Sequence, residues 1–359
     1  MKTLRSMPAL LLLAAASLAA AQDVPPEQRS DFRYSLSTID DLTIYRDLQA
    51  PLPQVHNQLL VEPTLTYRYK PMWSFSTSLI GLGDRYTDTY TRLHVREAYA
   101  GLSAGDFDFT LGRRIVRWGT GYAFTAIGVL DPPRIPTNTT DRLNVNEGRD
   151  MVKVDYVHGP HAFSLAWSSA ALAPAAANLH DTTAFRYNVL VHGFDTSLIA
   201  GDDRGGDAFG GVTFTRVLGQ AWEFHGEAAW REHPAVLLGA KYTTKGGITF
   251  LGEFFTPPNT PYFQDMTRYP LTGRQHYFFL SSGKNRLREL PGWKQWDLSA
   301  AAVANLNDHS FTAILDANRR FGNHFSTYLH VEIPSGNSKS EYGATPYSAA
   351  TSVGIRFQL

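Results

Sequence analysis

Residues 92–119 read RLHVREAYAGLSAGDFDFTLGRRIVRWG, and this stretch decides the fold. Two segments in which apolar residues recur at every second position flank the dipeptide Gly105-Asp106. Such alternation is typical of β-strands, and a glycine-containing pair between two strands predicts a tight hairpin turn. The segments and the residues just after them contain five arginines. The stretch therefore predicts an antiparallel hairpin that is apolar on one face and strongly basic elsewhere.

The same period of two runs through the rest of the chain after Asp31. Alternating segments occur at 73–79, 163–167, 222–230, 236–242, 248–254 and 325–333. Windows with the 3.6-residue period of a helix are scarce, and the alanine-rich stretch 170–177 is interrupted by Pro174. Because strands with one apolar and one polar face give this pattern, the sequence predicts an all-β protein.

Turn signals predict how the strands are connected. Short turns are expected at Lys70-Pro71, Gly105-Asp106, Gly159-Pro160, His192-Gly193, Gly219-Gln220, Gly246-Gly247 and Gly322-Asn323, with longer polar connections between them. Short turns at one end and long loops at the other are typical of a transmembrane antiparallel β-barrel of the outer membrane. If the first strand spans residues 32–45, the tight turns follow even-numbered strands. The number of predicted strands is then about 16–18. The segment 284–294 then falls on the tight-turn side despite its length.

Two other all-β architectures are less consistent with the chain. A soluble β-sandwich would have to divide into several domains at this length, yet no linker composition is present. A β-propeller would repeat a motif of about 40 residues, and none is found. We therefore expect one domain over residues 22–359.

Composition limits the classes of function. Residues 1–21 combine Lys2 and Arg5 with an apolar run that ends in Ala19-Ala20-Ala21, which predicts a secretory signal peptide. The chain has no cysteine, so disulfides, thiol catalysis and a lipoprotein anchor are excluded. The formal net charge is zero, which gives no global cationic field for nucleic acid. No metal-ligand spacing stands out, and we expect no cofactor.

Aromatic residues and the last strand point to a membrane environment. Aromatic residues flank the predicted tight turns, as in Phe107, Tyr156, Phe163 and Phe325, and would form an interfacial girdle against outer-membrane lipid. Residues 352–359 alternate and end the chain at Leu359. A terminal amphipathic strand of this kind resembles the signal read by the barrel-assembly machinery, which we expect as a partner.

The arginines of the hairpin need a polar environment. An arginine on the lipid face near the middle of the bilayer costs about 2–4 kcal/mol. Leu93 and Val95 lie on one strand face and Ala98 on the other, so the register must shift near Arg96-Glu97, most simply by a β-bulge. Arg113 and Arg114 cannot both face inward on a regular strand. We expect Glu97 and Tyr99 to face the lumen, with Glu97 paired to an arginine.

Two interpretations of these charges stay open at this point. In the first, a basic constriction favours anionic or polyhydroxylated solutes, since the arginine fork binds oxygens in pairs. In the second, the arginines form a structural ion-pair ladder with Glu97, Asp106 and Asp108. The candidate lumen and constriction residues are Arg92, Arg96, Glu97, Tyr99, Arg113, Arg114, Arg117, Trp118, Asp131 and Arg134.

The connection after Gly119 is unusual for a loop. Residues 122–130 read YAFTAIGVL, whereas loops over water are normally polar. We expect this segment to be buried in the barrel mouth, where it narrows the channel. A sticky extracellular patch for a partner is the alternative. Asp131-Pro132-Pro133 gives the segment a rigid exit.

The stretch around the hairpin resembles the alginate-export-like and related porin-like outer-membrane families. The resemblance covers about residues 92–135 and rests on Arg96, Glu97, Ala98, Tyr99, Leu111, Gly112, Arg113, Ile115, Trp118, Gly119, Asp131 and Pro132. Arg114 replaces the glutamine usual in the family, and Pro132 is doubled by Pro133. The resemblance implies a channel or solute-uptake role and transfers no substrate.

The sequence thus predicts a porin-like channel in the cell outer membrane for passive passage of small polar or anionic solutes. One alternative is a non-conducting barrel that anchors or assembles a surface polysaccharide through loop aromatics. These are Tyr86, Tyr90, Tyr262, Phe263, Tyr269, Tyr342 and Tyr347. A second is a lipid-modifying enzyme, although no nucleophile motif stands out.

Overall fold

The computed structural model describes residues 30–49, 53–69, 72–84, 90–132, 134–140, 142–169, 181–203, 207–231, 233–257, 275–287 and 292–359. The predicted signal peptide therefore lies outside the described residues, and its cleavage stays a prediction. No helix in these ranges is long and apolar enough to cross a membrane.

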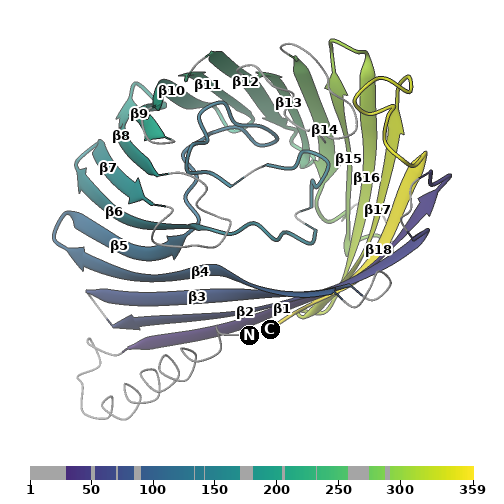
Figure 1. Ribbon diagram of the computed structural model, residues 1–359, viewed down its shortest axis with the longest axis horizontal. Coiled ribbons are helices and arrows are strands. Elements are labelled where there is room, and N and C mark those ends of the chain that lie inside the picture. The colour runs from purple at the N-terminus through teal and green to yellow at the C-terminus, as the bar shows by residue number, and fades with distance from the viewer. Residues whose placement is uncertain are drawn as a thin grey trace.

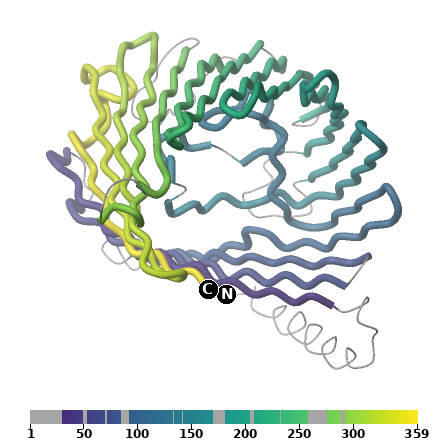
Figure 2. Tube along the Cα trace, turned by 180° about the vertical axis from the view of Figure 1, so that it is seen from behind, coloured from purple at the N-terminus to yellow at the C-terminus, as the bar shows by residue number. Residues whose placement is uncertain are grey.

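The chain forms one closed antiparallel barrel of 18 strands (Figures 1 and 2). The strands are β1 (Asp31–Arg46), β2 (Val55–Tyr69), β3 (Trp73–Asp84), β4 (Tyr90–Ala104), β5 (Phe107–Arg114), β6 (Arg149–His158), β7 (His161–Ser168), β8 (Thr182–Val191), β9 (Phe194–Asp203), β10 (Asp207–Leu218), β11 (Trp222–Trp230), β12 (Pro234–Thr243), β13 (Ile248–Thr256), β14 (Tyr277–Lys284), β15 (Trp296–Asn305), β16 (Ser310–Phe321), β17 (Phe325–Ser335) and β18 (Ala349–Gln358). Each strand pairs with its neighbour in sequence, and β1 also pairs with β18, so the ring has no free edge. The predicted fold class is confirmed.

The connections follow the predicted parity. The turns after the even-numbered strands from β4 to β16 contain glycines with positive φ, among them Gly105 (61°) and Gly159 (57°). The turn predicted at Lys70-Pro71 lies outside the described residues. A left-handed backbone costs glycine little, which explains its use at these turns. The connection between β14 and β15, residues 285–295, also lies on this side, as expected. Connections after odd-numbered strands vary more than predicted, because residues 306–309 form a short one and residues 115–148 the longest.

Alternation separates an apolar exterior from a polar interior. Leu93, Leu198 and Leu315 are exposed on the outer face, whereas Ser197 and Thr312 on the same or nearby strands are buried inside. An apolar outer band around a polar lumen is the arrangement of a membrane-spanning barrel.

Aromatic rings gather beside the tight turns, as predicted. The ring centroids of Phe107 and Tyr156 are 4.7 Å apart, and those of Phe163 and Tyr187 are 4.9 Å apart. Phe107 and Phe163 are exposed on the outer face, where a girdle would meet the membrane interface.

The hairpin that opened the sequence is β4–β5, and it contains the expected irregularity. Ser78 of β3 pairs with Glu97, whereas Leu79 pairs with Val95, so Arg96 is the extra residue of a bulge. The bulge moves the following apolar residues of β4 back to the outer face. The predicted register shift at Arg96-Glu97 is confirmed.

Candidate functional site

The connection between β5 and β6, residues 115–148, lies inside the barrel (Figure 1). We call it the inner loop. Its apolar part is buried: Phe124 is 0% exposed and Ile127 is 2% exposed. Phe124 stacks on Phe255 of β13 with ring centroids 4.9 Å apart, and Ile127 belongs to a cluster that includes Ile199 of β9. The segment 122–130 thus lies in the lumen as predicted and does not form an outer patch, with Ala123, Phe124, Ile127, Val129 and Leu130 buried and Tyr122 exposed.

Two buried glutamates of the barrel wall hold the backbone of the inner loop. Glu227 of β11 accepts hydrogen bonds from the N–H groups of Thr120 (2.5 Å), Gly121 (2.9 Å), Ala126 (2.6 Å) and Ile127 (3.1 Å). The glutamate is 2% exposed. A buried N–H without an acceptor is costly, so a carboxylate that accepts four of them strongly fixes this turn of the loop.

Glu253 of β13 does the same for the next residues. It accepts hydrogen bonds from the N–H groups of Tyr122 (2.5 Å), Ala123 (2.8 Å) and Phe124 (3.3 Å). Its Oε1 lies 2.8 Å from Nε2 of His225, and both side chains are fully buried. The alternation of β11 and β13 places these side chains on the lumen face. We refer to Glu227 and Glu253 as the anchor carboxylates.

The distal part of the inner loop contacts the other side of the barrel. Arg142 donates to Oδ2 of Asp41 on β1 at 2.8 Å, and the same oxygen accepts the Tyr328 hydroxyl of β17 at 2.5 Å. Thr139 donates to Asp316 of β16. The loop therefore spans the lumen between two walls.

Of the predicted site residues on β4, Arg96 and Glu97 both contact other polar groups. Arg96 donates to Glu62 of β2 at 3.2 Å and to the carbonyl oxygen of Asn144 at 3.1 Å. Glu97 accepts the Ile115 N–H at 2.8 Å. The expected pairing of Glu97 with an arginine is thus wrong, because its carboxylate is used where the chain leaves β5.

Arg113 and Arg114 do not share a face, as predicted. Arg114 donates to Thr110 at 2.9 Å and lies over the Tyr99 ring at 4.8 Å, so it belongs to the lumen side with both residues. Arg113 pairs with Asp150 (2.7 Å) and Glu147 (3.0 Å) at the base of the inner loop. Two carboxylates therefore offset the charge of Arg113, and it is not free to meet a solute.

The partners expected for a structural ladder also differ. Asp106 lies beside His158 at 3.1 Å, and Asp108 accepts the Ser103 hydroxyl. The carboxylates that pair with hairpin arginines are instead Glu62, Glu147 and Asp150. Glu147 and Asp150 follow the hairpin by more than 30 residues, so their pairing with Arg113 could not be predicted from proximity in the sequence.

Of the remaining predicted site residues in this stretch, two are exposed arginines and one is a buried tryptophan. Arg92 and Arg117 are exposed. Within the part of the chain that the structure describes, Arg117 makes no hydrogen bond or ion pair. Trp118 is buried in the same apolar cluster as Ile127, so it supports the inner loop and offers little surface to a solute.

Asp131 and Arg134 form the exit of the buried part of the loop. Asp131 accepts the N–H groups of Trp118 (2.7 Å) and Gly119 (3.1 Å) and lies 3.6 Å from Arg134. Burial raises the pKa of the Asp131 carboxyl, and these N–H groups and Arg134 oppose that effect. Arg134 also donates to the carbonyl oxygen of Gly119 at 3.1 Å.

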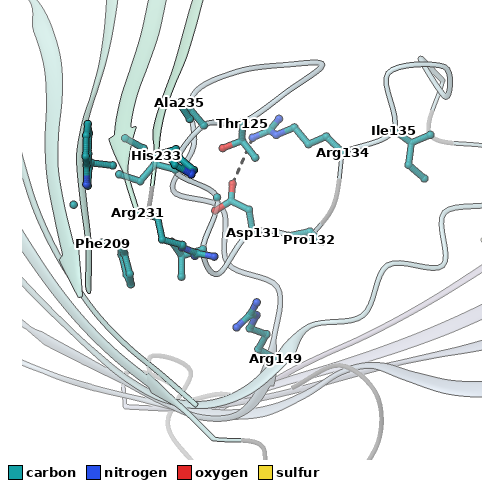
Figure 3. Close-up of a pocket in the computed structure, with 17 residues that line it drawn as sticks. Thr125, Asp131, Pro132, Arg134, Ile135, Arg149, Phe209, Arg231, His233 and Ala235 are labelled. Atoms are coloured by element: carbon teal, nitrogen blue, oxygen red, sulfur yellow. Dashed lines mark ion pairs between the residues drawn. The ribbon is translucent and has the colours of Figure 1, made fainter. Parts of the chain in front are cut away.

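A cavity of about 560 Å³ separates the inner loop from the wall formed by β10, β11 and β12 (Figure 3). Asp131 and Arg134 line it from the loop. Arg149, Arg231 and His233 line it from the wall side and were not among the predicted residues. The sequence signal was weak, because Arg149 and Arg231 stand at the ends of alternating segments, where charged residues are common.

Several solved structures share this architecture. OccK11 (OpdR) of Pseudomonas aeruginosa matches with a TM-score of 0.62 and 12% identity, over 92% of this chain and 96% of that chain. A loop-deletion mutant of OmpT, an outer membrane protein of Vibrio cholerae, matches with a TM-score of 0.50 and 11% identity, over 92% and 99%. A triple mutant of Rhodopseudomonas blastica porin matches with a TM-score of 0.50 and 11% identity, over 92% and 100%.

The sequence comparisons add no closer relative. No family model and no curated protein matches the chain. At such low identities, the likeness to solved structures shows the fold alone, which is that of porin-type outer-membrane barrels. The expected porin-like architecture is confirmed, whereas the resemblance to alginate-export-like proteins stays a prediction.

Proposed function

We propose that this protein is an outer-membrane channel for passive passage of small solutes. The observation that carries the proposal is the inner loop, which anchor carboxylates hold inside a closed barrel with an apolar exterior. A loop fixed within the lumen narrows the passage without the need for a moving part. Solutes would then be selected by size and by the charges that line the remaining space.

The lining supports a preference for anionic or sugar-like solutes. Arg92 and Arg117 are exposed, and Arg114 lies over Tyr99 on the lumen side. A guanidinium binds carboxylate, phosphate or neighbouring hydroxyl oxygens in pairs. Because carboxylates already offset Arg96 and Arg113, we assign the selectivity to Arg114 and Arg117.

Planar-bilayer recording of the purified protein tests the channel. We expect stepwise single-channel currents in potassium chloride and a reversal potential that indicates anion preference under a salt gradient. Complete absence of steps from protein whose folding is verified by heat-dependent gel migration would contradict the proposal.

The same preparation tests the alternatives. A non-conducting polysaccharide anchor would bind sugar polymer through loop aromatics without channel steps. Of the aromatics expected for this role, Tyr342 is buried and Tyr347 packs on Tyr45 with ring centroids 5.1 Å apart. The side chains of the other five lie outside the described residues. Release of fatty acid from added lipid would instead support an enzyme.

The C-terminal strand is proposed as the signal for the barrel-assembly machinery. β18 closes the ring against both β1 and β17, and Val353 and Ile355 are exposed on its outer face. Deletion of residues 357–359 is expected to lower the amount of folded protein in the outer membrane. Normal assembly of the truncated variant in the outer membrane would contradict this proposal.

A further inference from the structure

The cavity beside the inner loop has two chemically distinct sides. Ile127, Val129 and Phe209 are buried apolar side chains that border it. Arg149, Arg231 and His233 border it as well. Figure 3 shows Arg149 and Arg231 directed toward the same space beside Asp131. A pocket with an apolar wall and convergent cationic groups suits a ligand that is apolar at one end and anionic at the other.

The cationic groups keep donors available. Arg149 donates to Thr182 at 3.2 Å, and Arg231 contacts Asp203 at 2.9 Å. A guanidinium has five N–H donors, so each of these contacts uses a small part of the set. Among the described residues that line the cavity, Asp131 is the acidic one, and its oxygens already accept two N–H groups and face Arg134. Asp203 does not line the cavity but pairs with Arg231, so three arginines face two carboxylates and one positive charge remains in excess.

We infer that this cavity is a binding site for a small organic monoanion, with a carboxylate between Arg149 and Arg231 and an apolar body against Phe209 and Ile127. The inference rests on the proposed function, because a solute would reach the cavity through the lumen. The volume of about 560 Å³ fits a small organic molecule. The site would retain such solutes for a short time beside the constriction and so raise their local concentration.

Isothermal titration calorimetry with hexanoate tests the site on folded full-length protein in a non-ionic detergent. Hexanamide has the same shape without the charge, acetate has the charge without the body, and inorganic phosphate is a simple anion. We expect saturable binding of hexanoate that is at least tenfold tighter than that of the other three. Equal binding of hexanamide, or of acetate or phosphate, would overturn the inference.

Variants locate the binding. Arg149→Gln and Arg231→Gln are each expected to weaken hexanoate binding at least tenfold. Arg320→Gln is the matched control, because this arginine pairs with Asp297 elsewhere in the barrel at 2.7 Å, and we expect a change below twofold. Unchanged affinity in Arg149→Gln and Arg231→Gln would contradict the site.

A second variant guards against misfolding of the arginine variants. Ala229→Leu adds bulk to the cavity from β11 without a change of charge. We expect it to abolish hexanoate binding, and retained binding would contradict the location. Calorimetry does not require conductance, so the two proposals can fail separately. Channel steps without hexanoate binding would contradict the binding site alone. Hexanoate binding without channel steps would contradict the channel alone.

Discussion

The inner loop is held by two walls of the barrel, and the two attachments differ in kind. At the β11–β13 wall, Glu227 and Glu253 accept hydrogen bonds from backbone N–H groups of the loop. At the opposite attachment, Arg142 contacts Asp41 through its side chain. Backbone attachment fixes the path of the chain whatever the loop side chains are. Side-chain attachment depends on the identity of Arg142 and Thr139, and a long arginine side chain tolerates movement of the loop backbone. We infer that the first attachment positions the loop and the second orients its distal part.

The largest effect is expected when both anchor carboxylates are removed. In the double variant Glu227→Gln with Glu253→Gln, amide N–H groups would face backbone N–H groups that need acceptors. Each buried donor left without a partner costs about 1–3 kcal/mol, so the loop should leave the wall while the barrel stays closed. We expect single-channel conductance to rise at least twofold, with new tryptic cleavage inside residues 115–148.

Glu223→Gln is the matched control for that experiment. Glu223 also lies on β11, but among the described residues of the loop its hydrogen-bond partner is the Tyr122 hydroxyl at 2.7 Å. We expect its conductance to stay near that of the unmodified protein. Equal conductance in the double variant and in this control would show that the anchor carboxylates do not position the loop.

A smaller effect is expected at the other wall. Arg142→Gln removes the loop's ion pair with Asp41, but that carboxylate keeps the hydroxyl donors of Thr43 and Tyr328. Because Asp41 is buried, its carboxylate would be left without a paired cation, and the loss is about 3–5 kcal/mol of local stability. We expect greater current noise in single-channel records and little change in mean conductance. Arg33→Gln, at an exposed pair with Asp31, serves as the control. If Arg142→Gln raised conductance as much as the double anchor variant, both attachments would contribute equally to the position of the inner loop.

Ion selectivity tests the role of the arginine charges separately from the attachment of the inner loop. Arg117→Gln removes an exposed charge and is expected to lower anion preference modestly in reversal-potential measurements. Arg113→Ala combined with Arg117→Ala should lower it further, because Glu147 and Asp150 then lose their shared cation. Selectivity unchanged in both variants would leave these arginines with a structural role.

The smallest effect concerns pH and the connection between β17 and β18, whose Tyr342 belongs to the same apolar cluster as Phe124 of the inner loop. Burial raises the pKa of Glu341 to about 7, although hydrogen bonds from Asn305 and Tyr277 oppose this. A raised pKa means that the folded form favours the protonated acid, so stabilisation is full below the ordinary value of 4.5 and is lost as pH rises through about 7.

Hydrogen exchange of residues 340–345 measures this dependence. We expect faster exchange at pH 8 than at pH 5.5 in the unmodified protein after correction for the intrinsic rate. Glu341→Gln should remove the difference, because an amide does not ionise in this range. If Glu341→Gln kept the same difference in exchange rate between the two pH values, a titratable group other than Glu341 would cause it.

Part of the site could be predicted because the cause was local. The change of face between Val95 and Ala98 required an extra residue, and the bulge at Arg96 supplies it. The apolar run 122–130 could not remain in water, and it lies inside the barrel. Conversely, Glu227 and Glu253 looked like ordinary polar positions of alternating strands. Their partners in the inner loop lie 100 or more residues earlier in the chain, as in the contacts of Ile127 and Ala126 with Glu227.

The sequence by itself determined the barrel, its parity of short turns and the position of its main bulge. A period of two and the high cost of a charge in lipid act on each strand separately, so these features could be deduced from short segments. Tertiary structure decided where the inner loop is attached, which arginines carboxylates offset, and that Arg149 and Arg231 share a cavity. Those outcomes arise only when β1 meets β18 and the ring closes, because closure brings distant strands around one lumen.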